Sequence, residues 1–216
     1  MAYKIPTIFQ SLLMVFLVSF SSIAFSAPRI VGGADTDPGD YPWMASLQVK
    51  SSGEHICGGT LVDETWVLSA KHCFDQYVSS DLVIVVGEYN LSDTDETDQD
   101  SDPSLDQVSV DIATIFLHEH DDLVMIQLAE PVLHVTPISL ATQAHFDDIG
   151  PEELLTVVGW GNRNEDQTVE KDIPDVLQSV QVPLFDQNSC RENWKGEHFI
   201  SNSMFCAGFV EGGQNA

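Results

Sequence analysis

The clearest acid–base side chain in this 216-residue chain is that of His72. It belongs to residues 69–73, Ser-Ala-Lys-His-Cys, which directly follow the apolar residues 66–68. A neutral imidazole can accept a proton near neutral pH and return it, which makes histidine a frequent general acid and base. A histidine beside a cysteine at the end of an apolar strand is more often structural, however. His72 alone therefore does not establish a catalytic site.

A second cluster offers metal chemistry as an alternative. His118, His120 and Asp122 follow one another at His-x-His-x-Asp spacing. Two imidazoles and a carboxylate can hold zinc, and the spacing resembles that of metallo-β-lactamase-like hydrolases. Those proteins continue with a further histidine where this chain has Leu123, and their fold alternates strands with helices. We keep a metal-dependent hydrolase as a remote alternative.

The charge of the chain is strongly one-sided. It contains 8 Lys and Arg against 34 Asp and Glu, a net charge of −26. Nucleic acid is excluded as a partner, because phosphates need a basic surface. Seven acids crowd residues 93–106, and no Lys or Arg occurs between Lys71 and Arg163. Such a segment repels itself unless solvent, salt or a cation compensates, and a solvated acidic loop is the favoured interpretation.

Residues 1–26 are predicted to be a signal peptide. Lys4 supplies a positive start, residues 12–18 are apolar, and Ala24 and Ser26 fit the small positions of a cleavage site. A signal anchor is the alternative, because apolar character continues to the end of the segment. No other stretch approaches the roughly 20 apolar residues that span a bilayer. We expect a secreted protein, extracellular or periplasmic, with no membrane contact after signal removal.

Export to an oxidising compartment makes the four cysteines candidates for disulfides. Four cysteines allow three pairings, and sequence order does not choose among them. The pairs Cys57–Cys73 and Cys190–Cys206 each close a loop of similar, short length. Each bond could contribute about 3 kcal/mol by restricting the unfolded chain.

These residues require an all-β scaffold, because short apolar runs alternate with turns and show little helical periodicity. The region 130–153, which is rich in proline, reads as a linker between two halves. A short helix is expected at 186–194, capped by Asp186 or Asn188. The strands are expected at 43–50, 55–62, 66–69, 82–86, 108–117, 123–128, 155–159, 177–183 and 204–209.

Four ordered segments together resemble the trypsin/chymotrypsin family of serine proteases. They are residues 30–33 (Ile-Val-Gly-Gly), 69–73, 121–123 (Asp-Asp-Leu) and 158–161 (Val-Gly-Trp-Gly). The resemblance implies a double antiparallel β-barrel, with a first barrel at about 41–130 and a second from about 150. It also implies peptide-bond hydrolysis through an acyl-enzyme.

The resemblance assigns roles to two residues. His72 would be the general base and then the general acid, and Asp122 would orient its ring and stabilise the imidazolium. Lys71 departs from the small residue usual before this histidine. Cleavage after Arg29 would free the amino group of Ile30, as in zymogens of the family, leaving residues 27–29 as a short pro-segment. An activating trypsin-like protease is therefore an expected partner, beside protein or peptide substrates.

The nucleophile of the family is not found in this chain. Nothing resembles Gly-Asp-Ser-Gly-Gly, and the sequence reaches Ala216 where that segment would come next. We expect the second barrel to be incomplete here and the serine to lie beyond Ala216. A non-catalytic secreted homologue that binds partners is the alternative.

Two further expectations come from the resemblance. Asn215 falls where trypsin-like enzymes place the aspartate at the base of the specificity pocket, so strict tryptic specificity is not expected. Gly87 and Glu88 match the start of the calcium loop of some members, which makes Glu88 and Asn90 possible calcium ligands. No cofactor is required for the expected reaction.

Overall fold

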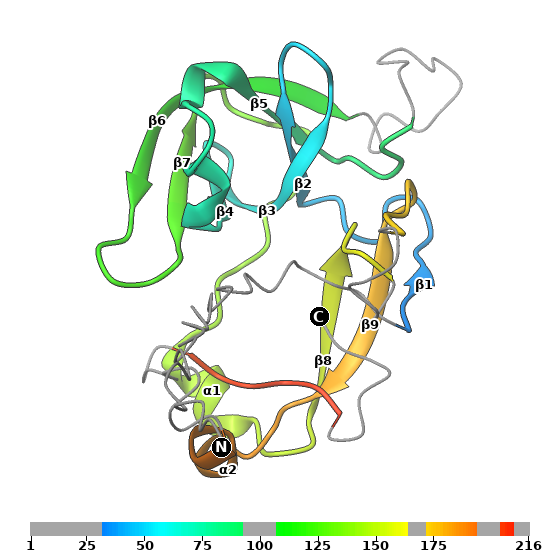
Figure 1. Ribbon diagram of the computed structural model, residues 1–216, viewed down its shortest axis with the longest axis vertical. Helices are drawn as coiled ribbons and strands as arrows, with labels where there is room; N and C mark the ends of the chain where they lie inside the picture. Colours follow the sequence, from blue (N-terminus) through cyan, green and yellow to red (C-terminus); the bar gives the residue numbers. More distant parts are fainter. Residues whose placement is uncertain (1–31, 93–106, 164–171, 194–203, 210–216) are drawn as a thin grey trace, which may run out of the picture.

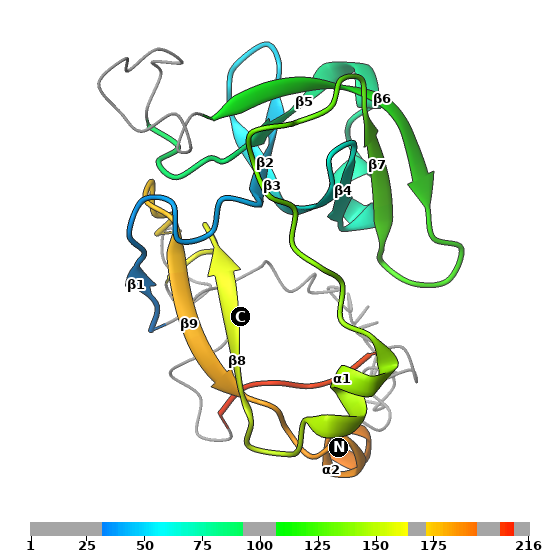
Figure 2. The same cartoon turned by 180° about the vertical axis from the view of Figure 1, so that it is seen from behind.

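The computed structural model describes residues 32–92, 107–163, 172–193 and 204–209 of the chain. These residues form two β units, which lie one above the other in Figure 1. Figure 2 shows, from behind, the connection after β7 that leads from the upper unit back to the lower one. The predicted signal peptide, the pro-segment and the acidic segment 93–106 lie outside the described residues.

The upper unit is a closed antiparallel barrel with the strand order β2-β3-β4-β7-β6-β5 (Figure 1). Hydrogen bonds between β2 and β5 close it, so that no strand of the barrel is left as an edge. The six strands agree with the expected positions to within two residues. They are β2 Met44–Val49, β3 His55–Asp63, β4 Trp66–Ser69, β5 Leu82–Val86, β6 Val108–Leu117 and β7 Val124–Leu128.

Alternating side chains fill the barrel. In β7, Val124, Ile126 and Leu128 are buried while the residues between them are partly exposed, as a strand with one inward face requires. Gly59 of β3 lies where the backbone comes close to the interior side chains of the barrel. A β-carbon at this position would lie 2.8 Å from Cγ1 of Val67. A glycine therefore lets β3 and β4 pack together.

The lower unit contains a three-stranded antiparallel sheet in the order β1-β9-β8. Its strands are β1 Ala34–Asp35, β8 Leu154–Gly159 and β9 Gln178–Pro183. The short helices α1 Gln143–Asp148 and α2 Gln187–Asn193 lie beyond one end of β8 and β9 in both views. A barrel joined to a second, partial sheet gives the chain the double-barrel architecture expected from its sequence.

A buried apolar seam joins the units. Met44 of the barrel packs with Trp160 and Leu177 of the lower unit, and all three are almost fully buried. Tyr89, just after β5, adds polar contacts, because its carbonyl oxygen accepts hydrogen bonds from Leu177 N–H at 2.9 Å and Trp160 Nε1–H at 3.4 Å. The carboxy-terminal half of the chain therefore positions itself against the barrel through Trp160.

One expected strand is wrong, and two elements were not expected. The strand at 204–209 is wrong, because within the described residues this run forms only one bridge, between Leu184 and Ala207, and Phe205 is 49% exposed. The region 130–153 contains α1, whose start is closed by a hydrogen bond from Thr142 N–H to His145 Nδ1. Strand β1 was not expected, since two residues carry no periodic pattern.

The helix expected at 186–194 is confirmed as α2. Of its two proposed caps, Asp186 is the one that acts, since its Oδ1 accepts a hydrogen bond from Ser189 N–H at 2.8 Å. A disulfide joins Cys190 in this helix to Cys206. Across the described ranges, no helix is long and apolar enough to cross a membrane.

Candidate active site

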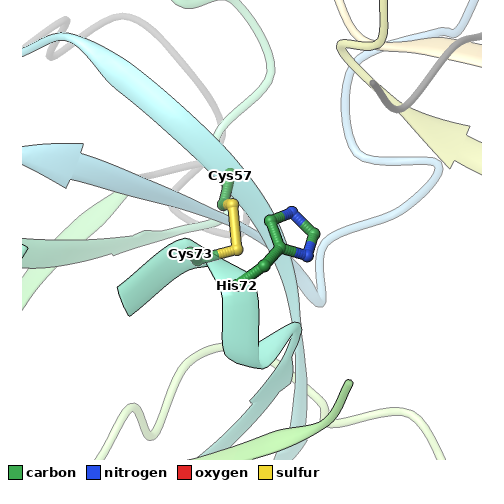
Figure 3. Close-up of side chains that lie close together, drawn as sticks. All are labelled: Cys57, His72 and Cys73. Atoms are coloured by element: carbon green, nitrogen blue, oxygen red, sulfur yellow. A yellow bond between two sulfur atoms is a disulfide. The ribbon is translucent and has the colours of Figure 1, made fainter. Parts of the chain in front are cut away.

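His72 is carried by a short 3₁₀ helix that follows β4. This turn, η1 Lys71–Phe74, is fixed by a disulfide between Cys73 and Cys57 of β3, and both cysteines are buried. Figure 3 shows the His72 ring beside this disulfide and turned away from it. Its side chain is 43% exposed, so a substrate could reach it. The disulfide thus anchors the backbone of the turn while the imidazole stays accessible.

Asp122 meets His72 at two points. Its Oδ1 accepts a hydrogen bond from the backbone N–H of His72 at 2.8 Å, and its Oδ2 lies 2.7 Å from Nδ1 of the imidazole. A carboxylate can only accept, so Nδ1 must carry a proton. In the neutral ring this leaves Nε2 as the basic nitrogen. The two residues expected to work together are therefore brought together in a geometry suited to proton transfer at Nε2.

The electrostatics of Asp122 agree with this geometry. Partial burial alone would raise the pKa of its carboxyl, but hydrogen bonds from the side chain and backbone of His72 and from the backbone of Lys71 outweigh that effect. The pKa of Asp122 is consequently lowered, and the group is ionised at neutral pH. The ionised carboxylate therefore accepts both hydrogen bonds from His72.

The same neighbourhood does not form a metal site. Cys57, His72 and Cys73 are the one group in the described part of the chain whose potential metal-binding atoms converge. Their two sulfurs are joined in a disulfide, whereas metals bind the free thiolate. The cluster therefore reflects the covalent anchor of η1.

The alternative zinc cluster is not assembled among the described residues. His118, His120 and Asp122 do not converge on a common point, and both carboxylate oxygens of Asp122 are engaged by His72. Nδ1 of His118 instead accepts a hydrogen bond from Asp121 N–H at 2.9 Å. The geometry gives no support to a metal-dependent hydrolase.

Of the possible calcium ligands, Glu88 is buried and Asn90 is partly buried. An oxygen of Glu88 accepts a hydrogen bond from Gln48 Nε2 at 3.0 Å. The side-chain oxygen of Asn90 accepts from Ser92, at 2.9 Å from its hydroxyl. The described residues thus supply one buried carboxylate, and the acids of residues 93–106 lie outside them. Arg29, Ile30 and Asn215 also lie outside the described residues.

A second histidine had no role in the sequence-based predictions. His55 of β3 lies with Nδ1 2.8 Å from the hydroxyl oxygen of Ser46, and its ring contacts that of Trp160 with centroids 5.3 Å apart. Burial lowers the pKa of His55 to about 4, so the ring is neutral at physiological pH. In the sequence, His55 is a single histidine within an apolar strand. This pattern does not indicate which residues it contacts in the folded chain.

Comparison with known proteins identifies the family. The family model described as trypsin matches residues 30–216. The chain is 31% identical over 204 residues to Trypsin-3 of Salmo salar, covering 90% of this chain and 78% of that protein. It is 33% identical over 195 residues to Coagulation factor IX of Oryctolagus cuniculus, covering 87% and 66% of the two chains.

A third relative is much longer. The chain is 33% identical over 205 residues to Serine proteinase stubble of Drosophila melanogaster, covering 90% of this chain and 25% of that protein. The match thus spans about a quarter of one relative and about two thirds or more of the others. The chain belongs to the trypsin family of serine proteases.

Proposed function

We propose that the complete protein is a secreted serine endopeptidase that hydrolyses peptide bonds through an acyl-enzyme. The observation that carries this proposal is the double contact between Asp122 and His72, with Nδ1 engaged and Nε2 left as the base. In this mechanism Nε2 removes the proton of a serine hydroxyl and later returns it to the leaving amine. The nucleophilic serine is proposed to follow Ala216 in the complete protein.

The protein is proposed to be made as a zymogen. Residues 1–26 would direct export, and residues 27–29 would form a short pro-segment ahead of a protease domain that starts at Ile30. A trypsin-like protease would activate it by cleaving after Arg29. Its membership of the trypsin family supports this route, because the family model begins at residue 30. Proteins or peptides outside the cell or in the periplasm would be the substrates.

Specificity is proposed not to be strictly tryptic. If Asn215 lies at the base of the specificity pocket, its neutral amide would give a substrate Arg or Lys no ion pair. A charged hydrogen bond contributes roughly 1.5–3 kcal/mol, so the preference for basic residues would weaken markedly. Turnover of Arg-ended and Phe-ended peptides by the activated enzyme would measure this, and a strong preference for Arg would contradict it.

The first test is to read the gene past the codon for Ala216, where a Gly-Asp-Ser-Gly-Gly segment is expected. The protein extended through that segment and cleaved after Arg29 should then hydrolyse peptide substrates. Asp122→Asn should reduce kcat by about 10⁴-fold, the magnitude established for the same change in the family's triad. Its matched control is Asp121→Asn, the adjacent acid that contacts His118 instead of His72.

Each outcome has a definite meaning. Activity that Asp122→Asn abolishes and Asp121→Asn retains supports the proposal. An extended, correctly cleaved protein without hydrolytic activity would contradict it and would favour the alternative, a non-catalytic homologue that binds partners. Equal loss in the two variants would mean that the His72–Asp122 pair is not the acid–base machinery.

A further inference from the structure

Lys71 makes a contact that its position before His72 does not by itself explain. It begins η1, and its Nζ donates a hydrogen bond to the backbone carbonyl oxygen of His118 at 3.3 Å. His118 is the first residue after β6, and Asp122 lies four residues further along the same turn. The backbone N–H of the next residue, His72, donates a hydrogen bond to Oδ1 of Asp122 at 2.8 Å. Residues 71 and 72 of η1 therefore contact both ends of the turn that carries Asp122.

This turn between β6 and β7 has little packing to hold it in place. His118, Glu119, His120 and Asp122 are all exposed. Inside the turn, His118 N–H donates to Leu123 O at 2.8 Å, which closes its neck. A segment with few buried contacts opens easily unless hydrogen bonds from a rigid neighbour hold it. η1 is such a neighbour, because a disulfide attaches it to β3.

Lys71 makes no ion pair with any carboxylate of the described residues. The chain carries 34 acids against 8 Lys and Arg, yet within the described ranges no carboxylate lies at ion-pair distance from Nζ of Lys71. Lys50 behaves differently, since its Nζ lies 2.9 Å from an oxygen of Asp111. Although the molecule is acidic, the Lys71 ammonium group donates to a backbone carbonyl oxygen. We therefore attribute its position to this hydrogen bond and not to a pairing of charges.

We propose that Lys71 is a positioning residue, which clamps the β6–β7 turn to η1 and thereby holds the Asp122 carboxylate against His72. Its side chain holds His118 at the start of the turn, and the backbone N–H of the adjacent His72 holds Asp122 near its end, so two neighbouring residues of η1 fix the turn at both ends. The importance of this clamp for catalysis rests on the proposed function. The effect of Lys71 on the His72–Asp122 contact can be measured in the 216-residue chain without any enzymatic activity.

The test follows the Nδ1 proton of His72 by proton NMR in the full 216-residue chain. The resonance is assigned by its loss in Asp122→Asn. Lys71→Met keeps the length of the side chain but removes the donor, and it should speed exchange of this proton with water about fivefold, the effect of one exposed hydrogen bond. The pKa of Asp122 should also rise toward its ordinary value.

Two variants separate this role from a general loss of stability. Lys71→Arg supplies another donor and should restore the slow exchange. Lys50→Met removes a lysine that pairs with Asp111 on the barrel, and it should leave the His72 proton unchanged even where it lowers the melting temperature. Wild-type exchange in Lys71→Met, failure of Lys71→Arg to restore it, or an equal effect of Lys50→Met would each overturn the proposal.

In the completed enzyme, the clamp has a kinetic signature. Lys71→Met should lower kcat about fivefold and leave KM unchanged, because the proposed role of the donor is to position Asp122 and not to bind substrate. An enzyme that proves inactive would overturn the proposed function without touching the NMR result. An active enzyme whose Lys71→Met variant retains full kcat would overturn the positioning role alone.

Discussion

His72 and His55 lie on neighbouring elements but in opposite environments. His72 is exposed, and its Nδ1 is hydrogen-bonded to the Asp122 carboxylate. His55 is partly buried between the Ser46 hydroxyl and the Trp160 ring, where a charge would lose much of its hydration. The exposed ring of His72 is accessible to a substrate, and the neutral ring of His55 forms part of the seam between the units.

The buried histidine predicts a pH dependence of stability. The pKa of His55 is lowered from 6.5 to about 4 in the folded chain, so between these values the unfolded state binds more protons. The free energy of unfolding should therefore be highest above pH 6.5 and fall toward pH 4, by about 3 kcal/mol from this group. Urea unfolding at about pH 7 and about pH 4.5 measures the difference in the free energy of unfolding, because most of the pH range in which His55 destabilises the folded chain lies between these two values.

The variant His55→Gln keeps a polar partner for Ser46 but does not titrate, so its stability should change less between the two pH values. His120→Gln is the matched control, since the side chain of His120 is 79% exposed and should leave the pH dependence unaltered. A His55→Gln variant with the wild-type slope would show that other groups cause the loss at low pH.

The pairing of His72 with Asp122 could be predicted from the sequence. The contacts that hold the surrounding elements in place could not. His72 and Asp122 stand in short motifs with distinctive residue order, which the resemblance to a known family can match. Lys71 and His55 act through contacts with His118 and Trp160, which lie 47 and 105 positions away in the chain. Contacts of this kind arise from the register of strands around the barrel, and local patterns do not encode them.

Among the secondary-structure elements, β3 and β4 show how closely the barrel is packed. The buried Gly59 faces Val67 across the strand pair, with room for a hydrogen and no more. Gly58, the preceding residue of β3, faces outward, and a β-carbon added to it would have nothing within 4 Å. Gly59 therefore has no room for a side chain, whereas the adjacent Gly58 has.

Gly59→Ala should destabilise the barrel, because the added methyl group meets Cγ1 of Val67 at 2.8 Å and Cδ1 of Leu47 at 3.2 Å. Overpacking of this kind typically costs about 1–3 kcal/mol. Gly58→Ala is the control and should be close to neutral. Denaturant midpoints compare the two, and equal midpoints would contradict the packing argument.

Strand positions followed from the sequence wherever one face of the strand is buried. In β7 the alternation of Val124, Ile126 and Leu128 with more exposed residues is complete, and the strand was predicted to within one residue. The run at 204–209 is equally apolar, but among the described residues it has one bridging partner and not a ladder. Composition identifies a segment that could pair, and only the fold supplies the strand it pairs with.

For the whole molecule, the dominant property is a net charge of −26. Repulsion between acids opposes the compact state. The Debye length, the distance over which two charges still interact, falls from about 30 Å at 0.01 M salt to about 8 Å at 0.15 M. The melting temperature should therefore rise with NaCl. Each kcal/mol of relieved repulsion corresponds to about 2–4 °C for a chain of this size.

A comparison of two salts tests the acidic segment as well. We propose that solvent and salt, and not calcium, compensate the acids of residues 93–106, so that NaCl and CaCl₂ at equal ionic strength should stabilise the chain equally. Additional stabilisation by CaCl₂, lost in Glu88→Gln, would instead support a calcium site built on the buried Glu88 carboxylate. A melting temperature independent of NaCl would contradict the role assigned to self-repulsion.

Strand β1 has a consequence for how the molecule would come apart. It precedes the barrel along the chain, yet it pairs with β9 of the lower unit, and Thr36 N–H donates to Leu177 O at 3.0 Å. The two units are interlaced, since β1 belongs to the lower unit, the barrel follows it, and the chain then returns to the lower unit. A protease that nicked the connection at Leu133, which is 72% exposed, would leave two fragments still hydrogen-bonded together. They would travel as one particle in a sizing column and separate only after denaturation.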